Sequence, residues 1–114
     1  MSIKLNIDST TKKYTDGVVG RIEHHAKEVE AAFAAIMGFV LVYSDSGSMA
    51  VREGRVQEIG NMGWAEFGGR RVAFRYEHAT RKIEVRDGSV QGPMLADFDN
   101  NTELTALLDF FKNL

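Results

Sequence analysis

The sequence predicts an α+β domain: a curved antiparallel β-sheet, a meander, packed on one long N-terminal helix, with a short C-terminal helix. Three patterns predict it. Apolar residues recur with helical spacing after Gly17, a run of short alternating segments with tight turns follows, and a second helical pattern ends the chain. A length of 114 residues indicates a single domain covering residues 1–114.

The N-terminal third is predicted to be a strand followed by the long helix. Residues 3–7 alternate apolar and polar side chains, which is typical of a strand. Thr15 or Asp16 can cap the helix, and Gly38 is expected to end it. The apolar side of this helix consists of Val18, Ile22, Ala26, Val29, Phe33 and Ile36.

Residues 39–43 read as a strand with two apolar faces, so both faces need a cover. The long helix is one cover. The C-terminal helix, a loop or another copy of the chain are the alternatives for the second. Ala31, Ala34 and Ala35 lie on the far side of the helix, where a second burial site would place them. We therefore take these alanines and Trp64 as candidates for an oligomer interface.

The middle of the chain is predicted to form hairpin-linked strands. Gly68-Gly69 and Asp87-Gly88 are the strongest turn signals. Asn100 and Glu103 have the spacing of a capping box for the last helix. The expected strands cover residues 49–52, 55–59, 61–67, 71–77 and 82–86, with one more, interrupted at Gly92-Pro93, within 90–98.

The strand at residues 61–67 has two possible orientations. In one, Gly63, Ala65 and Phe67 face the helix, while Trp64 points outward with Met62. In the other, Trp64 belongs to the core. The sequence does not distinguish between them.

The order of these elements resembles the helix-gripping arrangement of cystatin-like folds. The resemblance is limited to element order, because no sequence motif of that family is present, and it therefore implies no function.

Composition limits the function classes. The net charge is −2, so no overall field attracts nucleic acid or an anionic membrane. There is no cysteine, which excludes disulfides and fits a reducing cytoplasm. No apolar segment is long enough to span a membrane. Phosphate-binding, nucleophile-elbow and zinc-protease motifs are missing, so we expect no cofactor and no metal.

Besides a self-associating interaction module, the sequence leaves two alternative functions open. The first is a small pocket between helix and sheet, in which His25 acts as acid or base and Arg21 binds an anion. The other lining candidates are Tyr43, Trp64, Glu66 and Tyr76. The second alternative is single-stranded nucleic-acid binding by the arginine-rich hairpins, which interleaved acidic residues make the less favoured one.

We therefore expect a small, soluble, non-catalytic binding or interaction module that self-associates, with a dimer favoured. A small-molecule ligand is compatible with this expectation. The sequence indicates no catalytic residues, no membrane partner and no particular reaction.

Overall fold

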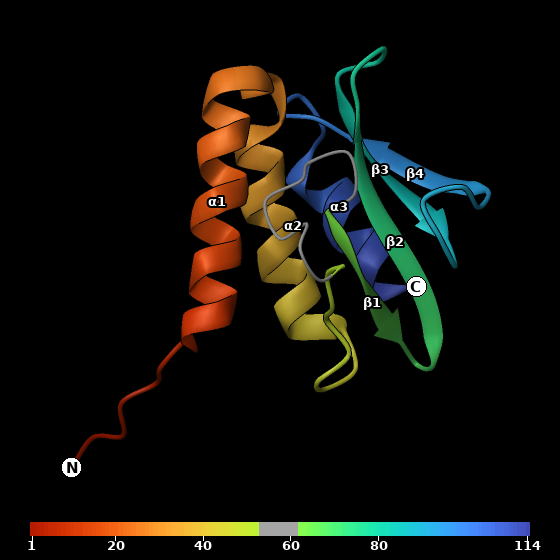
Figure 1. Ribbon diagram of the computed structural model, residues 1–114. Helices are drawn as coiled ribbons and strands as arrows, with labels where there is room; N and C mark the ends of the chain where they lie inside the picture. The colour runs from red at the N-terminus through yellow and green to blue at the C-terminus, as the bar shows by residue number, and fades with distance from the viewer. Residues whose placement is uncertain (53–61) are drawn as a thin grey trace.

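The computed structural model describes residues 1–52 and 62–114 (Figure 1). Helices cover one face of a four-stranded antiparallel sheet with strand order β1-β2-β3-β4. The predicted α+β class, with its meander and its short C-terminal helix, is confirmed. The elements are α1 (Ser9–His25), the 3₁₀ helix η1 (Lys27–Val29), α2 (Glu30–Tyr43), β1 (Gly63–Phe67), β2 (Arg70–Glu77), β3 (Lys82–Asp87), β4 (Met94–Phe98) and α3 (Leu104–Lys112).

The N-terminal segment differs from its prediction. Residues 3–7 are exposed and form no strand, and the chain runs away from the body of the protein until α1 begins (Figure 1). A strand needs a partner, and the alternating pattern alone does not supply one. Asp8, rather than Thr15 or Asp16, caps α1: its carboxylate accepts a hydrogen bond from the Thr11 amide at 2.8 Å.

The predicted single helix is instead a pair of helices. Ala26, at φ −152° and ψ 45°, ends α1, and η1 leads into α2, which runs back alongside α1 (Figure 1). One uninterrupted helix from residue 9 to residue 43 would be about 50 Å long, too long to bury its apolar side in a domain of this size. Folding back buries the whole predicted apolar row: Val18, Ile22, Ala26, Val29, Phe33 and Ile36.

Residues 39–43 are the end of α2, so the prediction of a strand there is wrong. Gly38 does not break the helix, because a glycine inside a helix costs only about 1 kcal/mol relative to alanine. Helical geometry buries Val40 and stacks Phe39 on Phe111 of α3, with ring centroids 5.9 Å apart. It leaves Leu41 and Val42 exposed. Apolar, β-branched composition suggested a strand, and tertiary packing overrode it.

Both predicted hairpin turns have the backbone that their glycines allow. Gly68 and Gly69 have φ values of 59° and 82°, and Gly88 has a φ of 77°. Asp45 stabilises the first turn, because its two carboxylate oxygens accept hydrogen bonds from the amides of Gly68 and Gly69, both at 2.8 Å. A loop after α2 therefore fixes the end of β1.

The burial of β1 settles its orientation. Gly63, Ala65 and Phe67 are buried toward the helices, and Trp64 faces the other side of the sheet. The predicted partner of Trp64 on that outer side, Met62, is instead only 3% exposed.

The strand predicted at residues 49–52 is reduced to a single bridge among the described residues. Ala50 pairs there with Trp64, and the other residues of 49–52 form no strand with the described part of the chain. The strand predicted at residues 55–59 lies outside the described residues. The interrupted strand after residue 90 appears as β4, which begins at Met94.

The last helix begins without the predicted capping box. Its N-cap is Glu103, and no side chain caps it. Asn100 instead joins the helical layer to the C-terminal segment. Its amide nitrogen donates to the Lys27 carbonyl at 2.9 Å, and its amide oxygen accepts from the Ala32 backbone N–H at 3.1 Å.

Gly63 provides a test of how tightly β1 is packed. Its φ is +132°, and a Cβ atom there would lie 2.6 Å from the Ala50 carbonyl oxygen. We expect Gly63→Ala to lower the free energy of unfolding by about 2 to 4 kcal/mol in urea denaturation. Gly20→Ala is the control, because Gly20 is helical with open space around it. This control should gain about 0.5 to 1 kcal/mol, and equal effects at both glycines would contradict the packing.

Candidate functional site

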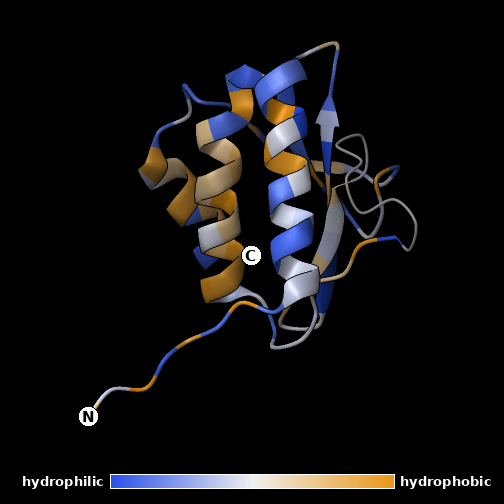
Figure 2. Ribbon diagram, turned by 60° about the vertical axis from the view of Figure 1, so that its left-hand side comes forward, coloured by the Kyte–Doolittle hydropathy of each residue, from blue (hydrophilic) through white to orange (hydrophobic). Residues whose placement is uncertain are grey.

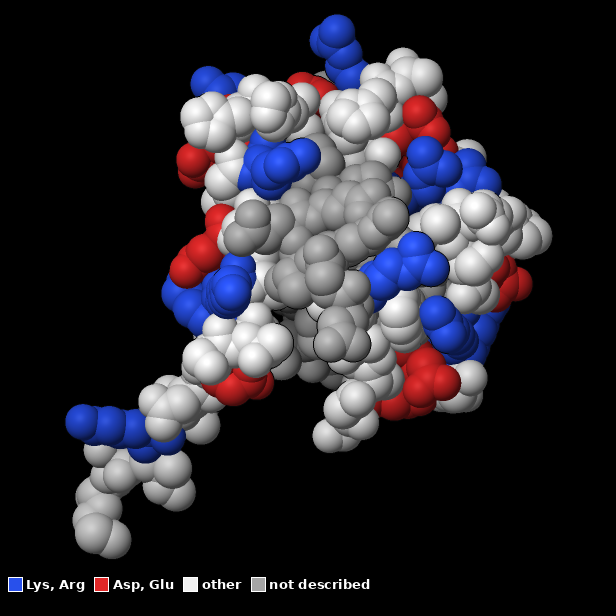
Figure 3. Space-filling model, viewed as in Figure 1, with Lys and Arg blue, Asp and Glu red and all other residues white. Residues whose placement is uncertain are grey.

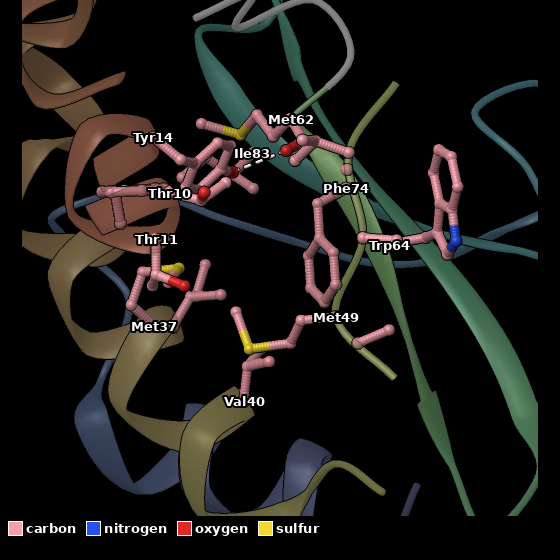
Figure 4. Close-up of a pocket in the computed structure, with 16 residues that line it drawn as sticks. Thr10, Thr11, Tyr14, Met37, Val40, Met49, Met62, Trp64, Phe74 and Ile83 are labelled. Carbon is pink, nitrogen blue, oxygen red and sulfur yellow. Dashed lines mark hydrogen bonds between the residues drawn. The ribbon is translucent and has the colours of Figure 1, made fainter. Parts of the chain in front are cut away.

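A cavity of about 290 Å³ lies between the start of α1, the middle of α2 and the inner side of β1 (Figure 4). Thr10, Thr11 and Tyr14 line it from α1, and Met37 and Val40 from α2. Its described lining contains no Asp, Glu, Lys, Arg or His. The sheet side and the preceding segment contribute Met49, Met62, Phe74 and Ile83, among others.

Tyr14 is the main polar group of this cavity. Its hydroxyl donates a hydrogen bond to the Met62 carbonyl at 2.5 Å, which ties α1 to the residue before β1 (Figure 4). Burial raises the pKa of Tyr14 far above its usual value. The phenol therefore remains protonated at neutral pH and acts as a hydrogen-bond donor, not as a base.

The six residues predicted to form a pocket are not gathered at this cavity. Arg21 and His25 are exposed on α1 and are not among its described lining residues. Trp64 does contribute to the lining, but its indole ring turns away from the cavity (Figure 4). The ring instead packs under the Arg71 guanidinium, whose central carbon is 4.3 Å from the ring centroid.

The other three predicted pocket residues are also dispersed. Glu66 is exposed on β1, and Tyr43 is half-buried at the end of α2. Tyr76 is buried under the helical layer, where its hydroxyl donates to the Glu28 carboxylate.

The cavity does not follow from the sequence prediction, because the predicted helix starts at Gly17 whereas α1 starts at Ser9. Thr10, Thr11 and Tyr14 precede that predicted start, so the sequence pattern does not place their side chains on one helix face. One signal was available. Asp8 has N-cap chemistry, and Tyr14, Val18 and Ile22 continue the apolar row at a spacing of four residues.

The bond between Tyr76 and Glu28 joins the sheet to the helix connection. Burial, and then the hydrogen bond to Glu28, raise the pKa of Tyr76 to about 12. The same hydrogen bond lowers the pKa of Glu28. These shifts have a structural cause, so they do not by themselves identify an active site.

The outer face of the sheet carries paired charges. Glu84 is only 5% exposed, and its carboxylate lies 2.8 Å from Arg86 Nη2 and 3.8 Å from Arg75 Nε. The hydrogen bond to Glu84 raises the pKa of Arg86 further. Lys82 and Asp97 form another such pair, on neighbouring strands. Acidic and basic groups are also interspersed on the face seen in Figure 3, so the arginines do not gather into a phosphate-binding track there.

The outer side of α2 is exposed and apolar. From Ala31 to Tyr43 this helix contains no charged residue. Its contrast with α1, which carries charges along its length, is visible in Figure 2. We call this surface the α2 outer face. It comprises Ala31, Ala34, Gly38, Leu41 and Val42, all exposed.

The interface candidates divide between two sides of the protein. Ala31 and Ala34 belong to the α2 outer face, and Ala35 is half-buried against the core. Trp64 lies on the far side of the sheet, so it cannot share one flat interface with the alanines.

Among the described helices, none is both long and apolar enough to cross a lipid bilayer.

The Tyr76–Glu28 bond predicts a specific alkaline behaviour. The folded-state pKa of Tyr76, about 12, exceeds the ordinary tyrosine pKa of about 10. The Tyr76 proton therefore stabilises the folded protein below pH 10, and this stabilisation is lost as the pH rises from about 10 toward 12. We expect Tyr76→Phe to cost about 1 kcal/mol at pH 7 and to lose stability less steeply above pH 10.

Urea unfolding at several pH values between 8 and 11 measures both effects. Tyr43→Phe is the control, because Tyr43 is only half-buried and makes no hydrogen bond to Glu28. This variant should keep the alkaline slope of the wild type. An unchanged slope in Tyr76→Phe would show that the bond does not couple to folding.

Comparison with known proteins gives one assignment. The family model described as "Integron cassette protein VCH_CASS1 chain" matches residues 11–108, which include α2, the whole described sheet and the start of α3. A search of curated proteins finds no match. The family description names no activity, ligand or partner. The chain belongs to the VCH_CASS1 family of integron cassette proteins.

Proposed function

We propose that this protein is a non-catalytic interaction module that self-associates as a dimer through the α2 outer face. One observation carries the proposal: the α2 outer face is exposed to solvent although it contains no charged residue. Leu41 and Val42 are 77% and 68% exposed, and no charged residue follows Glu30 in α2. Contiguous exposed apolar surface of this kind usually marks an interaction site.

The chemistry of the α2 outer face favours a second copy of the chain as the partner. The face offers no charge by which a charged peptide or nucleic acid could be selected. A two-fold dimer brings the same patch of each copy together, so an uncharged face meets an equally uncharged one. Ala31, Ala34 and Gly38 are small and spaced three or four residues apart, which lets two helix backbones approach closely.

The size of the face sets a further requirement. A stable interface hides about 800 Å² on each partner. The exposed side of α2, a helix of 14 residues, is about 21 Å long and about 10 Å wide. The interface therefore has to extend onto α3, which packs beside α2 and carries Leu104, 63% exposed.

The non-catalytic part of the proposal is supported by the ionisable groups. Within residues 1–52 and 62–114, the shifted pKa values belong to Asp8, Tyr14, Glu28, Tyr76 and Arg86. Each has a structural cause: a helix cap, burial or a fixed hydrogen bond. We keep a cytoplasmic location as part of the proposal, because the chain has no cysteine.

A charged substitution in the α2 outer face tests the dimer. We expect wild-type protein to be dimeric in native mass spectrometry and in light scattering at 10 to 100 µM. Ala34→Glu should be monomeric or poorly soluble, because an unpaired carboxylate at the centre of an interface is strongly unfavourable. The melting temperature should rise with protein concentration for the wild type and not for Ala34→Glu.

Ala106→Glu is the matched control. Ala106 is an exposed helical alanine of α3, one turn from Phe110, which packs on Phe98 of β4 and so lies away from α2. This variant should remain dimeric. A monomeric wild type at 100 µM, or a dimer unaffected by Ala34→Glu, would overturn the proposal.

A further inference from the structure

We infer that the cavity between α1, α2 and β1 is a binding site for a neutral, mainly apolar small molecule about the size of two fused rings. The cavity opens on a different side of α2 from the α2 outer face, because Met37 and Val40 line the one while Ala34 and Leu41 belong to the other. The inference is therefore independent of the proposed dimer.

The volume sets the size of the ligand. An apolar cavity of about 150 Å³ holds benzene. The cavity here, about 290 Å³, is roughly twice as large, which corresponds to two fused six-membered rings or a similarly compact aliphatic molecule. This volume lies at the lower end of the range found for small-molecule sites.

The walls set the charge of the ligand. A carboxylate or ammonium group in this cavity would lose its hydration and find no opposite charge among the described lining residues. The polar side-chain groups of the described lining are the Thr10, Thr11 and Tyr14 hydroxyls. The Thr11 hydroxyl donates to the Asp8 carboxylate at 3.1 Å, so its oxygen can accept a further hydrogen bond. Tyr14 already donates to Met62, so its oxygen can still accept a hydrogen bond. A ligand with one hydroxyl directed toward α1 would match these groups.

The walls are also adaptable. Met37, Met49 and Met62 approach the cavity from three different segments. Methionine is unbranched and polarizable, so it can adjust to ligands of different outline. Phe74 and Ile83 give the sheet side a fixed apolar floor. This combination fits recognition by shape and apolarity better than recognition by one specific polar pattern.

Methionine methyl groups provide the test, with 2-naphthol as the probe. The chain has five methionines, and three of them line the cavity. In ¹³C-methyl-labelled wild-type protein at pH 7, we expect 2-naphthol to shift the signals of Met37, Met49 and Met62 in a saturable way. The signals of Met1 and Met94 should stay in place. The charged analogue 2-naphthoate should bind at least tenfold more weakly.

A blocking variant tests the location independently. Thr10 lines the cavity from the first turn of α1 and is itself exposed. Thr10→Trp should fill the opening and weaken 2-naphthol binding at least tenfold, with an unchanged far-ultraviolet circular dichroism spectrum. Lys12→Trp is the control on the opposite side of the same turn. It gives up only a surface ion pair to Asp16, in which both side chains are 63% exposed.

The outcomes separate clearly. Saturable shifts confined to the three lining methionines, lost in Thr10→Trp and kept in Lys12→Trp, support the site. Three results would overturn it: no shift up to 1 mM 2-naphthol, equal shifts at all methionines, or equal affinity for 2-naphthoate. The methyl shifts need no substitution, so the test does not depend on the folding of Thr10→Trp. An oligomeric state that differs from the proposed dimer would not affect these results.

Discussion

The packing of Phe111 is the interaction on which the arrangement of the elements depends. Its ring lies 5.1 to 6.3 Å, between centroids, from five other phenylalanine rings. Aromatic pairs at such distances add about 0.5 to 1.5 kcal/mol each beyond their burial. The five partners come from α2, β1, β2, β4 and α3: Phe39, Phe67, Phe74, Phe98 and Phe110. One residue of α3 thus holds α2 and α3 against the sheet.

This cluster determines which surfaces remain available. By packing on Phe39, α3 covers one side of α2 and leaves Leu41 and Val42 without a cover. The α2 outer face therefore begins where the contact between α2 and α3 ends. Phe74 stacks on Phe111 and also lines the cavity. It therefore lies between the phenylalanine cluster and the cavity. The α2 outer face and the cavity lie on different sides of α2.

A second constraint acts at the junction of α1 and α2. Asn100 hydrogen-bonds to Lys27 and Ala32, and its backbone N–H donates to the Glu28 carbonyl at 2.8 Å. Glu28 in turn accepts from Tyr76 of β2. The C-terminal segment and the sheet thus hold the connection at which the helical layer reverses. Polar links between segments that are distant in the chain favour one chain path over its alternatives.

Sequence patterns alone determined the meander, the glycine turns, the apolar row from Val18 to Ile36 and the short C-terminal helix. These features follow from local rules: the period of apolar residues and the backbone freedom of glycine. The tertiary structure decided what local rules leave open. Residues 39–43 are helical because Phe39 stacks on Phe111 of α3. Residues 3–7 form no strand, because none of the described strands pairs with them. The earlier start of α1 has a sequence signal in Asp8 and Tyr14, but the cavity itself needs the tertiary structure, because Tyr14, Met37 and Met62 are far apart in the chain and meet only after the helices fold back. Periodicity reports which side of an element is buried, but only packing determines what covers it.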